Sequence, residues 1–120
     1  MKTILIADDS ESIRQLVEFT LKQAGYNVLK SEDGQEAIQH LNGQSIDLVI
    51  TDLNMPRVDG INLIREIRKN QMYMTVPVLL LTTESQTAKK DEAKEAGATG
   101  WIVKPFVQEK LLAVVQKVIR

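Results

Sequence analysis

The sequence predicts an α/β fold of the doubly wound type, (βα)5, in which a parallel five-stranded sheet alternates with five helices. Short apolar runs recur along the chain, separated by segments long enough for a helix. Each run is continuously hydrophobic instead of alternating, which is typical of strands in a parallel sheet that helices cover on both faces. We expect strands over residues 4–7, 28–29, 48–50, 78–81 and 101–103, the second being the weakest signal.

The first and last helices are predicted from apolar stripes. After Ser10, apolar side chains recur at helical spacing until Gly25, which favours a helix that ends there. A similar stripe in the last segment continues almost to the end of the chain, so we expect that helix to run to Arg120. The stripes are Ile13, Leu16, Val17, Thr20, Leu21 and Ala24 in the first helix, and Leu111, Leu112, Val115, Val118 and Ile119 in the last.

Three further helices are expected between these two. One covers residues 34–41, with Asp33 and Glu36 in the spacing of a capping box, and one covers residues 61–69. The third covers residues 87–96, and its apolar face consists only of alanines among charged side chains. Because alanines bury little apolar surface, we expect this helix to be the least firmly held.

Length and composition indicate one globular domain over residues 1–120. The formal net charge of -1 gives no attraction to nucleic acid or to an anionic membrane, so neither is expected as a partner. The absence of cysteine excludes disulfides, thiolate metal sites and cysteine nucleophiles. The apolar runs are too short for a signal-peptide core or a membrane span, so we expect a cytoplasmic protein. We also expect a monomer.

Polar residues follow directly after four of the predicted strands. They are Asp8 and Asp9 after the first, Asp52 after the third, Thr82 after the fourth and Lys104 after the fifth. In a doubly wound sheet, ligands bind outside the carboxyl ends of the strands, where the connections leave toward opposite faces. In the strand order 2-1-3-4-5, one of the common orders, the first and third strands are neighbours at that point. We therefore expect these side chains to meet in one site.

The three aspartates suggest a bound metal ion. Carboxylates that converge repel one another and raise their own pKa values unless a cation is present. Oxygen ligands without histidine or cysteine suit a hard ion, and a small set of protein ligands leaves room for the waters and phosphate that magnesium keeps. We therefore expect Mg²⁺ rather than Ca²⁺, held by Asp8, Asp9 and Asp52.

Together the five residues indicate phosphoryl transfer, which needs an in-line nucleophile and charge neutralisation on the transferred oxygens. Asp52 is the candidate nucleophile, because carboxylates can form aspartyl phosphates. Lys104 would supply a point cation and Thr82 a hydrogen-bond donor. Taken singly, the residues have ordinary alternatives: the aspartates as helix caps or turn residues, the lysine and threonine as structural residues. The combination is what favours a site.

Short motifs surround these residues: Ala7-Asp8-Asp9-Ser10, Thr51-Asp52-Leu53-Asn54-Met55-Pro56, Asp59-Gly60, Leu81-Thr82-Thr83-Glu84 and Val103-Lys104-Pro105-Phe106. Through them the chain resembles bacterial response-regulator receivers over nearly its whole length. The resemblance implies a flavodoxin-like, CheY-like fold with order 2-1-3-4-5, and receivers are themselves an example of that order. It also implies phosphorylation of Asp52 by a sensor histidine kinase, a metal ligand from the backbone carbonyl of Asn54, and a cis bond between Lys104 and Pro105.

Within this family the chain is similar to the chemotaxis subclass, through Asn54 and Glu84. The resemblance implies that these two residues tune dephosphorylation, that Thr82 moves toward the phosphate, and that the aromatic residue on the fifth strand rotates inward after it. That residue is Trp101, where Tyr or Phe is more usual, and its alternative is a partly buried covering residue. The implied output partner is the flagellar motor switch, and a phosphatase is a further candidate partner.

The alternatives differ in class. A receiver of this kind is a signalling switch that assists its own phosphorylation and dephosphorylation, and it could also serve a phosphorelay or a non-flagellar output. A magnesium-dependent phosphatase would typically carry a second Asp two residues after the nucleophile, where this chain has Asn54. A flavodoxin-like cofactor carrier would bind a phosphate among three acids, which is unfavourable without a metal.

Overall fold

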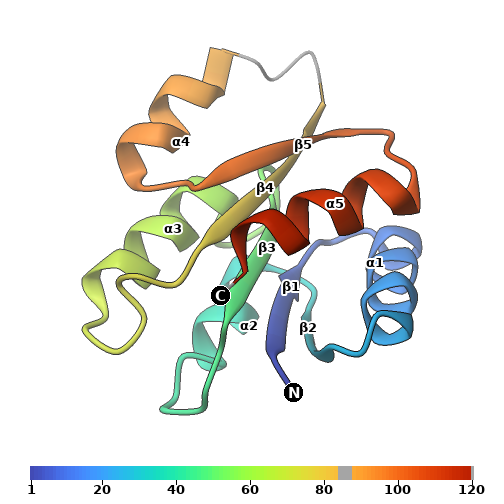
Figure 1. Ribbon diagram of the computed structural model, residues 1–120. Coiled ribbons are helices and arrows are strands. Elements are labelled where there is room, and N and C mark those ends of the chain that lie inside the picture. Colours follow the sequence, from blue (N-terminus) through green and yellow to red (C-terminus); the bar gives the residue numbers. More distant parts are fainter. Residues whose placement is uncertain (84–87, 120) are drawn as a thin grey trace.

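A parallel sheet runs through the centre of the molecule, and the computed structural model describes residues 1–83 and 88–119 (Figure 1). Within those residues the sheet has five strands in the order β2-β1-β3-β4-β5, with parallel pairing throughout, which confirms the predicted fold. The strands are β1 (Thr3–Ala7), β2 (Asn27–Ser31), β3 (Leu48–Asp52), β4 (Val78–Thr83) and β5 (Gly100–Lys104).

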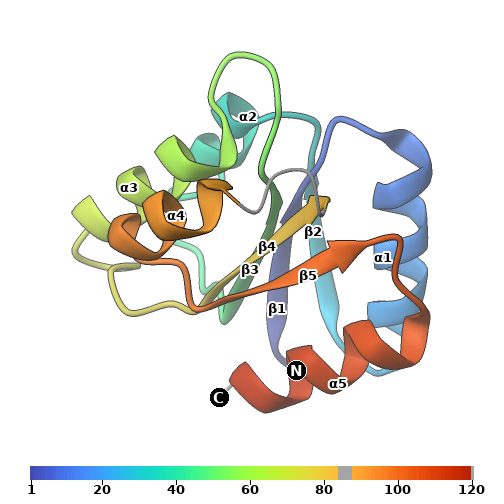
Figure 2. The ribbon, with the colours of Figure 1, turned by 90° about the horizontal axis from the view of Figure 1, so that it is seen from above.

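The helices cover the two faces of this sheet. Helices α1 and α5 lie on one face, and α2, α3 and α4 lie on the other (Figures 1 and 2). Their bounds are α1 (Glu11–Gln23), α2 (Gly34–Gln39), α3 (Gly60–Lys69), α4 (Lys90–Ala96) and α5 (Gln108–Val118). In the described part of the chain, no helix combines the length and the apolarity needed to cross a bilayer.

The core explains why β1 and β4 are largely continuous apolar runs. Along β1, Leu5 packs under α2 and α3, whereas Ile4 and Ile6 pack under α1 and α5. Because successive side chains of a strand point to opposite faces, a sheet covered on both sides needs apolar residues at every position. β4 repeats the arrangement, with Leu80 on the first face and Leu79 on the second.

Side-chain caps fix where several helices begin. The Ser10 hydroxyl accepts the N–H of Ile13 at the start of α1, and the helix follows Ser10 as the sequence predicted. The Asp33 carboxylate accepts the N–H of Glu36 at 2.8 Å, but Glu36 in turn accepts the N–H of Glu32, one residue before the cap. The predicted capping box is therefore only half formed.

Two predicted helix ends are wrong, and one predicted start is not tested. α2 ends at Gln39 instead of residue 41, because the N–H of Leu41 bonds to the carbonyl of Ile38 in a tighter turn. α4 begins at Lys90, and the expected start at Thr87 lies outside the described residues. α5 ends at Val118 instead of reaching Arg120, since Ile119 adopts an extended backbone (φ -75, ψ 142) while its side chain still packs on the core.

Candidate functional site

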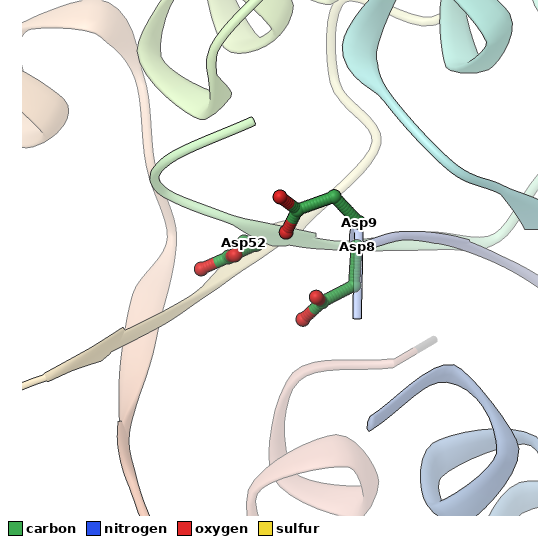
Figure 3. Close-up of side chains that lie close together, drawn as sticks. All are labelled: Asp8, Asp9 and Asp52. Carbon is green, nitrogen blue, oxygen red and sulfur yellow. The ribbon is translucent and has the colours of Figure 1, made fainter. Parts of the chain in front are cut away.

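Asp8, Asp9 and Asp52 meet at the carboxyl ends of β1 and β3, and Figure 3 shows their side chains gathered there. One oxygen of each carboxylate lies within 4.8 Å of one from each of the others. The two strands are hydrogen-bonded neighbours, with Ala7 paired to Thr51, so the residues that follow the pair emerge side by side. The strand order thus brings together acids that are more than forty positions apart in sequence, as predicted.

Asp8 is buried and held on both carboxylate oxygens. Its Oδ1 accepts the N–H of Ser10 at 2.8 Å, and its Oδ2 lies 3.2 Å from the Lys104 Nζ. The capping alternative for Asp8 is therefore partly true, because its carboxylate closes the turn into α1 while Ser10 provides the N-cap itself.

Lys104 reaches the site from the end of β5, across β4 and β3. Its Nζ lies 3.2 Å from Asp8 Oδ2 and 3.3 Å from Asp52 Oδ1, and the side chain is only 18% exposed. One ammonium group thus bridges two carboxylates in a partly buried setting, where charge interactions are stronger than at the surface. The bond from Lys104 to Pro105 is cis, as the resemblance implied.

Asp52 is the residue of the site whose pKa is shifted. Burial raises the pKa of its carboxyl above the usual value, the negative charge of Asp8 raises it further, and the Lys104 ammonium opposes both effects. The Asp52 Oδ1 also accepts the N–H of Leu53 at 2.9 Å.

This donor set fits a magnesium ion. It consists of carboxylate oxygens from three residues, and the repulsion between Asp8 and Asp52 is the kind that a bound cation relieves. Hard divalent ions prefer oxygen ligands, and Mg²⁺ is usually held by one or two carboxylates with waters completing its shell. Asp9 is the exposed member of the cluster, which leaves one side of it open to solvent.

Thr82 lies on β4 beside Asp52, since the neighbouring Leu81 is paired with Asp52 across the strands. Its side chain is buried, and its hydroxyl donates to the carbonyl of Thr83 at 3.2 Å. Asn54 is exposed in the loop after β3. Glu84 lies outside the described residues, so the structure does not place it.

Trp101 lies on β5 with 38% of its surface exposed, at the edge of a small cavity under α4. Lys90 lies over its ring, with Nζ 4.8 Å from the ring centroid, a cation–π contact. The cavity is also lined by Leu53, Thr82 and Ala93. This placement agrees with the alternative reading of Trp101 as a partly buried covering residue. Trp101 and Thr82 also line the same cavity.

Sequence reasoning missed two arginines near the site. Arg14 on α1 donates from Nη1 to the backbone carbonyl of Asp8 at 2.7 Å. Arg57, in the loop after β3, pairs with Asp33 at the start of α2, with Nη2 2.6 Å from Oδ2. The acids were found because they follow the ends of neighbouring strands. Neither arginine contact joins two such residues, so the same pattern could not predict the arginines. The position of Arg14 on the predicted first helix, close behind Asp8 and Asp9, was the available signal.

The comparisons with known proteins agree with this geometry. The family model for the response regulator receiver domain matches residues 4–116. The uncharacterized transcriptional regulatory protein YrkP of Bacillus subtilis is 44% identical over 110 residues, which cover 92% of this chain and 46% of YrkP. The chain spans about half the length of the curated transcriptional regulators that it matches.

Solved structures of separate receivers match over nearly the whole chain. The chemotaxis protein CheY4 of Vibrio cholerae superimposes with a TM-score of 0.94 at 44% identity, covering 99% of both chains. The receiver domain of the sensor histidine kinase PA1611 from Pseudomonas aeruginosa, solved with a magnesium ion coordinated in its active site cleft, gives 0.89 at 27% identity and covers 98% of this chain and 96% of that one. The chain therefore belongs to the response regulator receiver domain family, signalling switches that take phosphate from histidine kinases and pass the signal to output partners.

Proposed function

We propose that this chain is a single receiver domain over residues 1–120 that accepts a phosphoryl group on Asp52 from a sensor histidine kinase. Mg²⁺ would be held by Asp8, Asp9, Asp52 and the backbone carbonyl of Asn54. The observation that carries the proposal is the position of Lys104, whose Nζ lies between Asp8 Oδ2 and Asp52 Oδ1 at 3.2 and 3.3 Å. A cation set between two acids at the carboxyl edge of the sheet suits the neutralisation of a transferred phosphoryl group.

The transfer forms a bond between a carboxylate oxygen of Asp52 and phosphorus, and breaks the bond from phosphorus to the imidazole nitrogen of the kinase. Asp52 must be ionised to attack, yet burial and the charge of Asp8 raise its pKa. The Lys104 ammonium lowers that pKa and is close enough to attract the phosphoryl oxygens. When bound, Mg²⁺ supplies further positive charge at those oxygens.

We propose that phosphorylation of Asp52 changes the conformation of Thr82 and then of Trp101 on β5. Phosphorylation adds about one negative charge next to the buried Thr82, whose hydroxyl we propose as the donor that moves toward the phosphate. Thr82 and Trp101 line the same cavity, so a shift of the threonine changes the space open to the indole. Asn54 and Glu84 are proposed to tune the loss of the phosphoryl group.

The proposal also names an output partner, the protein that the phosphorylated chain would bind. We infer a flagellar motor switch protein as the output partner, because CheY4 is a chemotaxis protein and matches this chain over 99% of both lengths. The second candidate is a receiver module of a transcriptional regulator, which YrkP favours at the same 44% identity. Binding of the phosphorylated chain to a flagellar motor switch protein, measured against the unphosphorylated chain, separates these outputs.

The experiment that tests the site is uptake of phosphate from acetyl phosphate, followed by intact mass spectrometry. We expect one phosphoryl group per chain with MgCl₂, none when the metal is removed by EDTA, and none in the Asp52→Asn variant. Uptake by that variant at the wild-type level would contradict the assignment of Asp52. Turnover of small phosphate esters would instead favour a phosphatase. A flavin absorbance band in the purified protein would favour a cofactor carrier.

A further inference from the structure

Arg14 makes a contact that is not explained by packing of the helix alone. Its side chain is 14% exposed, and its Nη1 donates to the backbone carbonyl oxygen of Asp8 at 2.7 Å. The other end of the guanidinium lies 3.6 Å from a carboxylate oxygen of Glu32, whose side chain is 69% exposed. Because Glu32 is largely exposed, an ion pair at that distance contributes little. The hydrogen bond to Asp8 is therefore the main interaction of the partly buried Arg14 side chain.

The carbonyl that Arg14 binds belongs to the peptide joining Asp8 to Asp9, and the two aspartates are held very differently. Asp8 is fixed through its N–H, which donates to Ser31 at 3.2 Å, and through its bonded carboxylate. Asp9 is exposed, and within residues 1–83 and 88–119 its carboxylate makes no hydrogen bond or ion pair. The direction of the Asp9 side chain therefore depends on the plane of the peptide before it, which Arg14 holds.

We propose that Arg14 is a positioning residue for the magnesium site, acting through the Asp8–Asp9 peptide to aim the Asp9 carboxylate at its neighbours. This inference rests on the proposed function of the acidic cluster. Groups that orient a metal ligand commonly change the metal affinity about tenfold or more when removed. Arg14 would thus be needed for tight Mg²⁺ binding although it cannot itself bind a cation.

A purely electrostatic role for Arg14 predicts the opposite sign. A positive charge beside three carboxylates repels Mg²⁺, so its removal alone would strengthen metal binding. If Arg14 positions the peptide, its removal weakens metal binding in spite of the charge that is lost. The direction of the change in affinity therefore separates the two roles.

The test is a titration of the ¹⁵N-labelled full chain with MgCl₂, followed by amide chemical shifts, which also report whether each variant is folded. For Arg14→Gln we expect the Mg²⁺ dissociation constant to rise about tenfold. Arg14→Lys keeps the positive charge but carries its donors on one nitrogen with a shorter reach, so we expect a smaller rise. A matched control is Lys22→Gln, which removes a cation from the exposed surface of the same helix and should leave the constant within about twofold.

Glu32→Gln tests whether Arg14 acts through its ion pair instead, and we expect it to behave like the Lys22 control. An unchanged or lower dissociation constant in Arg14→Gln would overturn the inference, as would a Glu32→Gln variant as weak as Arg14→Gln. If Arg14→Gln does not fold, Arg14→Lys decides, because a charge-only role predicts no change in it. Wild-type protein that binds no Mg²⁺ would overturn the metal site itself, whereas wild-type binding with an unaffected Arg14→Gln would overturn only the role of Arg14.

Discussion

Arg57 and Asp33, 24 positions apart, join the loop after β3 to the start of α2. Arg57 donates from Nε and Nη2 to one oxygen of Asp33, at 2.9 and 2.6 Å, while the other oxygen of Asp33 caps the helix. Arg57 is also the one non-glycine residue with positive φ (68) among those described, a conformation that costs about 1 kcal/mol. The ion pair joins the loop that carries Asn54 to the start of α2.

Gly34 provides the close approach between this loop and α2. A Cβ at position 34 would overlap the backbone carbonyl oxygen of Val58, which cannot move away as a flexible side chain could. We expect Gly34→Ala to lower the free energy of unfolding by about 1–3 kcal/mol, as overpacking typically does. Urea unfolding measures it, with Gln35→Ala, an exposed position on the same helix, as the control. Equal stability of the two variants would show that the loop and α2 are not in such close contact.

Asp33 should make stability depend on pH. Its pKa lies below the usual value, chiefly because its carboxylate accepts the N–H of Glu36 and further because of Arg57. A carboxyl with a lowered pKa in the folded chain adds stability above its unfolded pKa, and the contribution is lost as the pH falls through the folded pKa. The stability difference between wild type and Asp33→Asn should therefore be largest near neutral pH and decline below about pH 4. A stability difference that stays constant across urea unfolding curves from neutral to acidic pH would contradict the lowered pKa of Asp33.

Asp52 should have the opposite effect on stability. Its pKa is raised, chiefly by burial, so its ionisation costs folding free energy once the pH exceeds the unfolded pKa. Without Mg²⁺ at neutral pH we expect Asp52→Asn to be more stable than wild type by an amount on the order of 1 kcal/mol, because burial and the charge of Asp8 outweigh the pairing with Lys104. MgCl₂ should reduce this difference in stability, because Mg²⁺ binds the folded wild-type chain and stabilises it. Unfolding curves with and without MgCl₂ test this, and a variant less stable than wild type without metal would refute it.

Trp101 offers a direct optical readout of the switch, because it is the single tryptophan of the chain. Its indole is 38% exposed under Lys90, and we expect phosphorylation to move it toward the cavity that it shares with Thr82. Burial should shift the emission to shorter wavelength, recorded with and without acetyl phosphate. An unchanged spectrum in a sample that mass spectrometry shows to be phosphorylated would mean that the indole does not move.

The sequence was sufficient for the parts of the site that depend on topology. Asp52 and Lys104 end their strands and Asp8 directly follows one. In a parallel sheet the carboxyl ends share one edge, so residues far apart in sequence could be placed together. Strand identities followed from continuous apolar runs for the same physical reason.

The contacts that depend on how far an individual side chain extends could not be predicted from the sequence. The contact of Arg14 is with a backbone carbonyl, and any long polar side chain on α1 looks equivalent in sequence. The left-handed backbone of Arg57 occurs at a residue type that rarely adopts it. The end of α5 was misplaced because Ile119 continues the apolar stripe from an extended backbone, which periodicity alone does not distinguish.

Chemical trapping of the phosphorylated residue tests the central claim most directly. Treating the phosphorylated protein with borohydride reduces an aspartyl phosphate to homoserine, which peptide mass spectrometry then locates. We predict that homoserine forms at position 52 only, in a reaction that requires MgCl₂ during phosphorylation. Homoserine at position 8 or 9, or a stable phosphate on a residue other than an aspartate, would contradict the account.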